Sequence, residues 1–220
     1  MHGEERAELA RQALAGYVNG PDAPQAATSL ALKKAETARA VIIVEGISDQ
    51  IAIETLAVRR RRDLESEEIA VVPIGGAQAI TKYLRAFGPD GENLGLAGFC
   101  DADAAENFRR GLIKTGFGEP TSTAAMASLG FYVCVRDLED ELIRAVGPDQ
   151  VKTIVESQGE ISAFRTFQKQ PEWREQPVGD QLHRFIRSKA RRSLRYARLL
   201  VDAVDLDRVP RPLDATLAHV

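Results

Sequence analysis

Six acidic residues follow the apolar runs of this chain, at the points where buried strands are expected to end. Glu45 comes directly after the run 40–44, and two more acids come directly after the run 94–100. In an open parallel sheet such positions meet at the carboxyl edge, where ligands bind. Carboxylates gathered there raise each other's pKa or require a cation. The six residues are Glu45, Asp49, Asp101, Asp103, Asp137 and Glu139.

The cation that suits these acids is Mg²⁺, a hard ion that takes oxygen ligands and keeps waters for a phosphate substrate. Single members of the set have a plainer explanation, because an Asp-X-Asp pair often caps a helix. Asp137 and Glu139 could likewise be the acidic start of a helix. The placement of Glu45 and Asp101 after two successive buried runs favours a metal site.

A second group of candidate functional residues lies in the basic segment 181–200, which contains seven Arg or Lys and no Asp or Glu. The whole chain, by contrast, has a net charge of -3. Arginines three or four residues apart would form one stripe on a continuous helix over 181–204. Such a stripe suits regularly spaced phosphates, and a solvated helix face is the alternative. The residues expected to bind nucleic acid are Arg184, Arg187, Arg191, Arg192 and Arg195.

The elements that must position these residues alternate along the chain. Apolar, partly β-branched runs predict buried strands, and amphipathic spacing predicts helices between them. This alternation predicts an α/β fold, with a mostly parallel central sheet flanked by helices. The expected strands are 40–44, 69–74, 94–100 and 131–135, and the expected helices between or after them are 50–60, 77–87, 104–114 and one ending at 146.

Three segments are expected from this pattern. Residues 1–39 form a helical lead and a linker or weak helix, residues 40–147 form the α/β domain, and residues 148–220 form a helical extension. The extension is expected to hold helices 149–157 and 161–168 and the basic helix 181–204, with Pro210 and Pro212 closing the tail.

The composition limits which classes of protein this chain can belong to. A chain of 220 residues with 44% hydrophobic residues can bury a core. No apolar run approaches the length of a membrane span, and the charged N-terminus is unlike a signal peptide. Cys100 and Cys134 lie in apolar runs and are expected to be buried, reduced thiols. These features predict a cytoplasmic protein.

Four motifs together resemble the TOPRIM domain, in the form found in OLD-family (overcoming lysogenization defect) nucleases. The resemblance covers roughly residues 40–147, and it implies a Rossmann-like fold, one or two Mg²⁺ or Mn²⁺ ions and hydrolysis of DNA phosphodiester bonds, with RNA as the less favoured substrate. The motifs are Val44-Glu45-Gly46-Ile47-Ser48-Asp49, Pro73-Ile74-Gly75-Gly76-Ala77, Phe99-Cys100-Asp101-Ala102-Asp103 and Asp137-Leu138-Glu139.

The resemblance also implies roles for single residues. Glu45, Asp101 and Asp103 match the signature acids of TOPRIM domains, and Asp49, Asp137 and Glu139 match the acids that hold a second metal in OLD nucleases. A catalytic lysine precedes an aromatic-alanine pair in the family, and Tyr196-Ala197 is similar to that pair. Ser193 occupies the place expected for the basic residue, so Lys189 is assigned the catalytic role, with Arg191 and Arg192 as alternatives.

OLD proteins usually join this domain to an ABC-type ATPase, but the chain contains no Gly-X-X-X-X-Gly-Lys-Ser/Thr motif. Either the chain is a freestanding protein of this kind, or the ATPase is a separate chain or a part removed from this sequence. The initial Met followed by a helical segment favours a small natural protein, and a homo-oligomer remains open. Two rival functions are a non-hydrolytic nucleic-acid-binding subunit that acts with an ATPase, and a glycosyltransferase that uses Asp101-Ala102-Asp103.

Overall fold

The computed structural model describes residues 3–17, 20 and 22–220. Its contacts divide the chain into two compact units. We call the first the sheet unit, which comprises Val18–Leu138 and Pro210–Val220, and the second the helical unit, which comprises Met1–Tyr17 and Glu139–Val209. The expected segment 1–39 includes residues 1, 2, 18, 19 and 21, which lie outside the described part.

The sheet unit is built on four parallel strands in the order β2-β1-β3-β4. Val41 on β1 pairs with Ala70 on β2 and with Leu96 on β3. Every residue of β1 and β2 is buried, as expected for strands covered on both faces. The predicted α/β fold with a parallel sheet is confirmed. The strands are β1 (Ala40–Val44), β2 (Ile69–Pro73), β3 (Gly95–Cys100) and β4 (Phe131–Val133).

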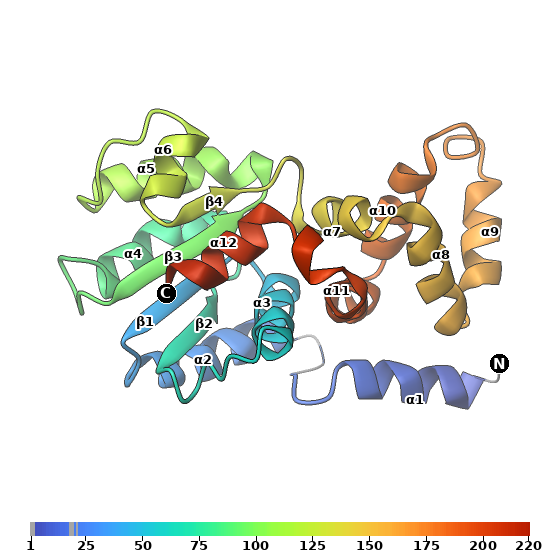
Figure 1. Cartoon of the computed structure of the whole chain (residues 1–220), viewed down its shortest axis with the longest axis horizontal. Coiled ribbons are helices and arrows are strands. Elements are labelled where there is room, and N and C mark those ends of the chain that lie inside the picture. Colours follow the sequence, from blue (N-terminus) through green and yellow to red (C-terminus); the bar gives the residue numbers. More distant parts are fainter. Residues whose placement is uncertain (1–2, 18–19, 21) are drawn as a thin grey trace. The chain divides into compact units, whose positions relative to one another are not determined.

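Helices cover both faces of this sheet (Figure 1). Helix α12 crosses β3 on the face that also carries α3, and α4 and α5 pack together on the other face, where Ile80 and Phe108 join Ile43 in one apolar cluster. The helices of the sheet unit are α2 (Ala23–Ala35), α3 (Ile47–Arg59), α4 (Ile80–Phe87), α5 (Ala105–Lys114), α6 (Thr123–Ser128) and α12 (Arg211–His219), with 3-10 turns at Ala77–Ala79 and Ala102–Ala104.

Two helices differ from the expected organisation. The expected linker or weak helix is α2, which packs on β2, and its Thr28 hydroxyl donates to the Pro73 carbonyl at 2.5 Å. The expected closed tail is α12, in which Pro212 occupies an early helical position that tolerates proline. Arg60 pairs with Asp214 at 2.7 Å. The sheet unit therefore includes α2 and α12, which both lie outside the expected segment 40–147.

The helical unit contains no strand in its described residues. Helix α1 packs on α11, where Arg198 donates to the Ala13 carbonyl at 3.3 Å, and α8 packs on α9 and α10. Its helices are α1 (Gly3–Ala13), α7 (Leu138–Val146, which begins in the sheet unit), α8 (Pro148–Ser157), α9 (Ile161–Gln168), α10 (Val178–Arg187) and α11 (Ala190–Ala203), with a 3-10 turn at Leu206–Arg208.

The predicted continuous helix over 181–204 is wrong. The chain leaves the helix at Lys189, whose φ of -145° and ψ of 128° are extended, so α10 ends and α11 begins there. No Gly or Pro occurs between Asp180 and Val204 to announce this break. A tertiary hydrogen-bond network described below accounts for it.

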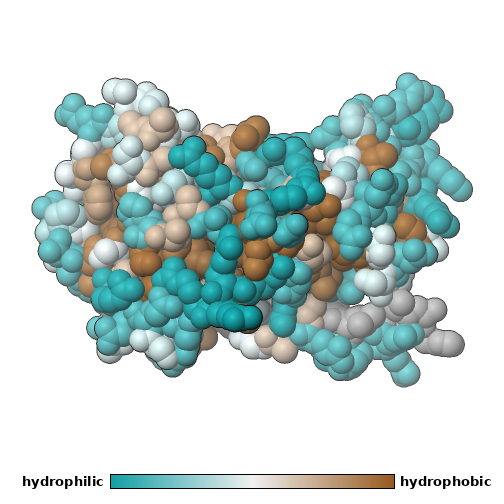
Figure 2. All heavy atoms as spheres, viewed as in Figure 1, coloured by the Kyte–Doolittle hydropathy of each residue, from teal (hydrophilic) through white to brown (hydrophobic). Residues whose placement is uncertain are grey.

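Hydrophilic and apolar residues are mixed on the face shown in Figure 2. The large apolar side chains that are exposed come from separate elements, which is ordinary for a protein surface. They are Leu30, Val58, Ile113, Val135 and Val178. Among the described residues, no helix has the length and apolar character needed to cross a membrane.

Candidate metal centre and nucleic-acid interface

The carboxyl ends of β1 and β3 bring Glu45 and Asp101 together. Glu45 Oε1 accepts a hydrogen bond from the Asp101 backbone N–H at 2.8 Å. The backbone carbonyl of Glu45 accepts from the N–H groups of Gly75 (3.0 Å) and Gly76 (3.1 Å), which follow β2. Both glycines have positive φ, 74° and 118°, which other residues rarely adopt. Glu45 therefore connects the carboxyl ends of β1, β2 and β3 through hydrogen bonds.

The turn after β3 also meets the turn after β4. The N–H of Ala102 donates to the Arg136 carbonyl at 2.9 Å, and this bond brings the Asp101–Asp103 turn beside Asp137. Asp103 is exposed, whereas Asp137 is 4% exposed. The predicted gathering of acids at this edge of the sheet is thus present for Glu45, Asp101, Asp103 and Asp137 by backbone placement.

Asp49 lies in the first turn of α3 and is buried. Its Oδ2 accepts from the N–H of Gly46 at 2.9 Å, a bond that satisfies one of the free N–H groups at the helix start. One oxygen of Asp49 therefore serves the helix cap.

The charges of four of these acids act on a single buried thiol. Burial raises the pKa of Cys100, and the negative charges of Glu45, Asp101, Asp49 and Asp103 raise it further. Four carboxylates within electrostatic reach of one strand end make this edge a strongly negative site. Cys100 stays a neutral thiol there.

The chemistry of the acids fits a hard divalent cation. All are oxygen donors, and Asp101 and Asp103 are accessible to solvent. In the described part of the chain, however, no three Asp, Glu, His or Cys side chains are arranged as a ready-made metal site.

Glu139 belongs to the helical unit and has partners there. Glu139 is 7% exposed, and it accepts a hydrogen bond from the Ser193 hydroxyl. Arg187 Nη1 lies 3.9 Å from its Oε2. Ser193 stands where a basic residue was expected. It contacts the Glu139 carboxylate, which also lies near Arg187 of α10. Lys189 is exposed at the start of α11.

The predicted row of nucleic-acid-binding arginines is divided between two environments. Arg184, Arg187 and Arg191 are exposed. Arg192 and Arg195 are buried and form ion pairs with Glu160 at 3.0 and 2.6 Å. These two arginines therefore do not lie on an exposed stripe, because both are buried against Glu160 inside the helical unit.

Glu160, which binds both buried arginines, was not among the residues expected to matter. It precedes α9 and follows Gly159, whose φ is 65°. No spacing rule links Glu160 to residues of α11 so far along the chain. In the sequence, a single acid before an apolar helical segment indicates only an ordinary helix start.

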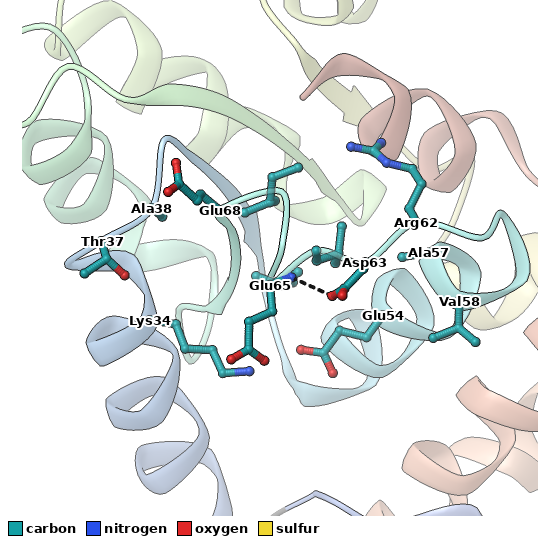
Figure 3. Close-up of a pocket in the computed structure, with 13 residues that line it drawn as sticks. Lys34, Thr37, Ala38, Glu54, Ala57, Val58, Arg62, Asp63, Glu65 and Glu68 are labelled. Atoms are coloured by element: carbon teal, nitrogen blue, oxygen red, sulfur yellow. Dashed lines mark hydrogen bonds between the residues drawn. The ribbon is translucent and has the colours of Figure 1, made fainter.

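A pocket of about 460 Å³ lies at the opposite, amino end of the strands (Figure 3). Lys34 from α2, Glu54 from α3 and Glu65 from the following loop line it. Arg62 also borders the pocket, but its guanidinium donates to Glu67 and to the carbonyls of Leu217 and Val220. Two arginines of the run 59–62 therefore hold α12 and the C-terminus.

The parallel sheet with acids at its carboxyl edge is similar to a TOPRIM domain over part of the chain. Residues 37–103 match the family model described as "Overcoming lysogenization defect protein-like, TOPRIM domain". The match contains Glu45, Asp49, Asp101 and Asp103, and it confirms the resemblance to the OLD-like TOPRIM domain for this segment. No curated protein matches the chain significantly.

Solved structures give the same fold over most of the chain. The C-terminal region of the Xanthomonas campestris pv. campestris OLD protein matches with a TM-score of 0.67 and 22% identity, covering 85% of this chain and 94% of that one. The C-terminal region of the Burkholderia pseudomallei OLD protein matches with a TM-score of 0.65 and 21% identity, covering 83% of this chain and 96% of that one. At these identities the likeness establishes the fold.

Proposed function

We propose that this protein is a divalent-metal-dependent endonuclease that hydrolyses or nicks DNA phosphodiester bonds. The observation that carries the proposal is the hydrogen bond between Glu45 and the Asp101 backbone, which joins two carboxylate-bearing strand ends at the edge where parallel sheets bind ligands. The match to the OLD-like TOPRIM model supports it, because the matched segment contains both acids.

We assign the first Mg²⁺ or Mn²⁺ ion to Glu45, Asp101 and Asp103, and a second ion to Asp49 and Asp137 of the same unit. A metal-binding role of Glu139 stays a prediction from the sequence. Bound divalent ions supply Lewis acidity to phosphate oxygens and activate water for attack. Glu45 also holds the turn after β3 in place, because its Oε1 accepts from the Asp101 N–H.

The basic residues complete the proposal. Exposed Arg184, Arg187 and Arg191 would bind backbone phosphates, which fixes the position of the nucleic acid without reading its sequence. Lys189, exposed at the break between α10 and α11, would supply the cation that stabilises transition-state charge. DNA is the proposed partner, with a separate ATPase chain or a second copy as a further one.

We also propose a cytoplasmic location. Cys100 and Cys134 are both buried thiols outside any disulfide, as is usual in a reducing compartment.

The test is a nicking assay on supercoiled plasmid with Mg²⁺, Mn²⁺, Ca²⁺ or EDTA. We expect open-circular DNA with Mg²⁺ or Mn²⁺ and none with EDTA. Equal cleavage in EDTA would contradict the metal mechanism. DNA retention without cleavage under every metal would favour the non-hydrolytic binding subunit.

A further inference from the structure

Glu160 is the centre of a buried hydrogen-bond network in the helical unit. It is 5% exposed and accepts from Arg192 Nη2 (3.0 Å), Arg195 Nη2 (2.6 Å) and the Tyr196 hydroxyl (3.1 Å). Burial acts to raise the pKa of Glu160, but the hydrogen bond from Arg192 and the charges of Arg195 and Arg192 bring it below its usual value. Glu160 therefore stays charged and paired at neutral pH.

Arg192 connects this hydrogen-bond network to the end of α10. Its Nη1 donates to the Phe185 carbonyl and to the Ser188 hydroxyl, each at 2.8 Å, and its guanidinium lies 3.9 Å from the centre of the Phe185 ring. The last carbonyls of a helix lack intrahelical donors, and a cation there is favourable. Arg192 thus supplies a donor to a carbonyl at the end of α10, while the other side of its guanidinium binds Glu160.

This arrangement explains why the chain breaks at Lys189 without Gly or Pro. The Arg192 guanidinium, which Glu160 fixes in place, donates to the Phe185 carbonyl and to the Ser188 hydroxyl at the same time. These bonds turn α11 away from α10. We call residues 185–192 the basic corner. Its exposed cations are Arg187, Lys189 and Arg191.

The start of α11 is an unfavourable place for the cations of the basic corner. Three cations, Lys189, Arg191 and Arg192, lie at the start of α11, where the helix dipole disfavours positive charge, and no side chain caps this terminus. Two buried arginines share the single carboxylate of Glu160, and Arg195 Nε has no hydrogen-bond partner among the described residues. Positive charge is therefore concentrated at a helix start that no side-chain cap stabilises.

We infer that Glu160 is a positioning residue which, through Arg192, sets the exposed cations of the basic corner in the arrangement that binds a nucleic-acid phosphate backbone. The inference rests on the proposed function. It assigns the buried arginines Arg192 and Arg195 to the support of the site and the exposed residues Arg187, Lys189 and Arg191 to phosphate contact.

Salt dependence of duplex DNA binding tests this inference. Arg192→Lys keeps the net charge but lacks the planar fork that reaches Glu160 and Phe185 together. We expect it to flatten the plot of log Kd against log salt by roughly 0.9 for each phosphate that the variant no longer binds. Glu160→Gln should do the same although it makes the protein more positive. Ser188→Ala, a milder change at the same corner, should give a smaller effect in the same direction.

Arg165→Lys is the matched control, because Arg165 is exposed on α9 of the same unit. It should leave the salt slope unchanged, whereas Arg187→Gln should flatten it. Circular dichroism at the assay temperature verifies that each variant is folded, and Ser188→Ala stands in if a buried variant is not. A merely structural role for Glu160 would lower the melting temperature and leave the slope of the folded protein unchanged.

The outcomes separate the inference from the function on which it rests. If Arg187→Gln flattens the slope but Arg192→Lys, Glu160→Gln and Ser188→Ala do not, the positioning role is overturned and the proposed function stands. If the unaltered protein shows no salt-dependent DNA binding, both are overturned. Flattening by the charge-conserving Arg192→Lys, without an effect of Arg165→Lys, supports the inference.

Discussion

The carboxylate of Glu45 and the backbone of Asp101 meet where β1 and β3 end, at 2.8 Å. Glu45→Gln keeps the shape and the acceptor oxygen but removes the charge that a divalent ion needs. We predict that it weakens Mn²⁺ binding by at least about 10-fold, since even indirect partners of metal ligands cost 10- to 100-fold when changed. Isothermal titration calorimetry measures this.

Glu92→Gln makes the same chemical change at an exposed position in the turn before β3, at the other edge of the sheet. It should leave Mn²⁺ affinity unchanged. Equal affinity in Glu45→Gln and the unaltered protein would show that the ion binds elsewhere.

Asp49 has two possible roles, helix cap and metal ligand, and they respond differently to substitution. An Asn at this position can still accept the Gly46 N–H, whereas Ala cannot. We predict that Asp49→Ala lowers the free energy of unfolding by about 0.5–2 kcal/mol and that Asp49→Asn retains most of it. Both should weaken Mn²⁺ binding, as measured by calorimetry beside urea unfolding. Unaltered Mn²⁺ affinity in Asp49→Asn would leave the cap as its role.

Among the elements, α10 and α11 depend on an acid whose pKa is lowered by folding. A depressed folded pKa means that Glu160 stabilises the native state above the unfolded pKa of about 4.3 and loses this as pH falls through the folded value. We predict that the unaltered protein unfolds at higher urea than Glu160→Gln at pH 7 and pH 5. The difference should shrink as the pH falls below the unfolded pKa. A difference that grows on acidification would contradict this ion-pair account.

Helix α12 should matter for the sheet although it is remote from it in sequence. Leu217 is buried, and the Thr216 hydroxyl donates to the Gly98 carbonyl of β3 at 3.2 Å. We predict that Leu217→Ala costs about 2–5 kcal/mol of unfolding free energy, measured by urea with circular dichroism. Leu30→Ala, at a side chain 51% exposed, should stay within about 0.5 kcal/mol. Similar losses in both would refute the packing role of α12.

The elements also show what the sequence could and could not predict. Strands such as 40–44 were predictable because buried β-branched runs have one common solution, and Glu45 and Asp101 followed from their positions after such runs. The break at Lys189 was not, because a long-range capture by Arg192 and Glu160 causes it. Helix α12 was missed since its early proline is a helix start as well as a tail signal.

For the whole molecule, opposite charges are assigned to different parts of the chain. The seven cations of 181–200 belong to the helical unit, whereas Glu45, Asp49, Asp101, Asp103 and Asp137 belong to the sheet unit. A net charge of -3 therefore conceals one part suited to phosphates and one suited to cations. Metal-dependent cleavage of DNA would require both.

The most direct test of this account is the Mg²⁺-dependent nicking rate of supercoiled plasmid, compared between the unaltered protein, Asp101→Asn and the control Glu92→Gln. The account predicts nicking by the unaltered protein and by Glu92→Gln, and a loss of at least about 100-fold in Asp101→Asn, comparable to removing one group that stabilises transition-state charge. Nicking by folded Asp101→Asn at the unaltered rate would contradict the claim that the carboxyl edge of the sheet is the catalytic site.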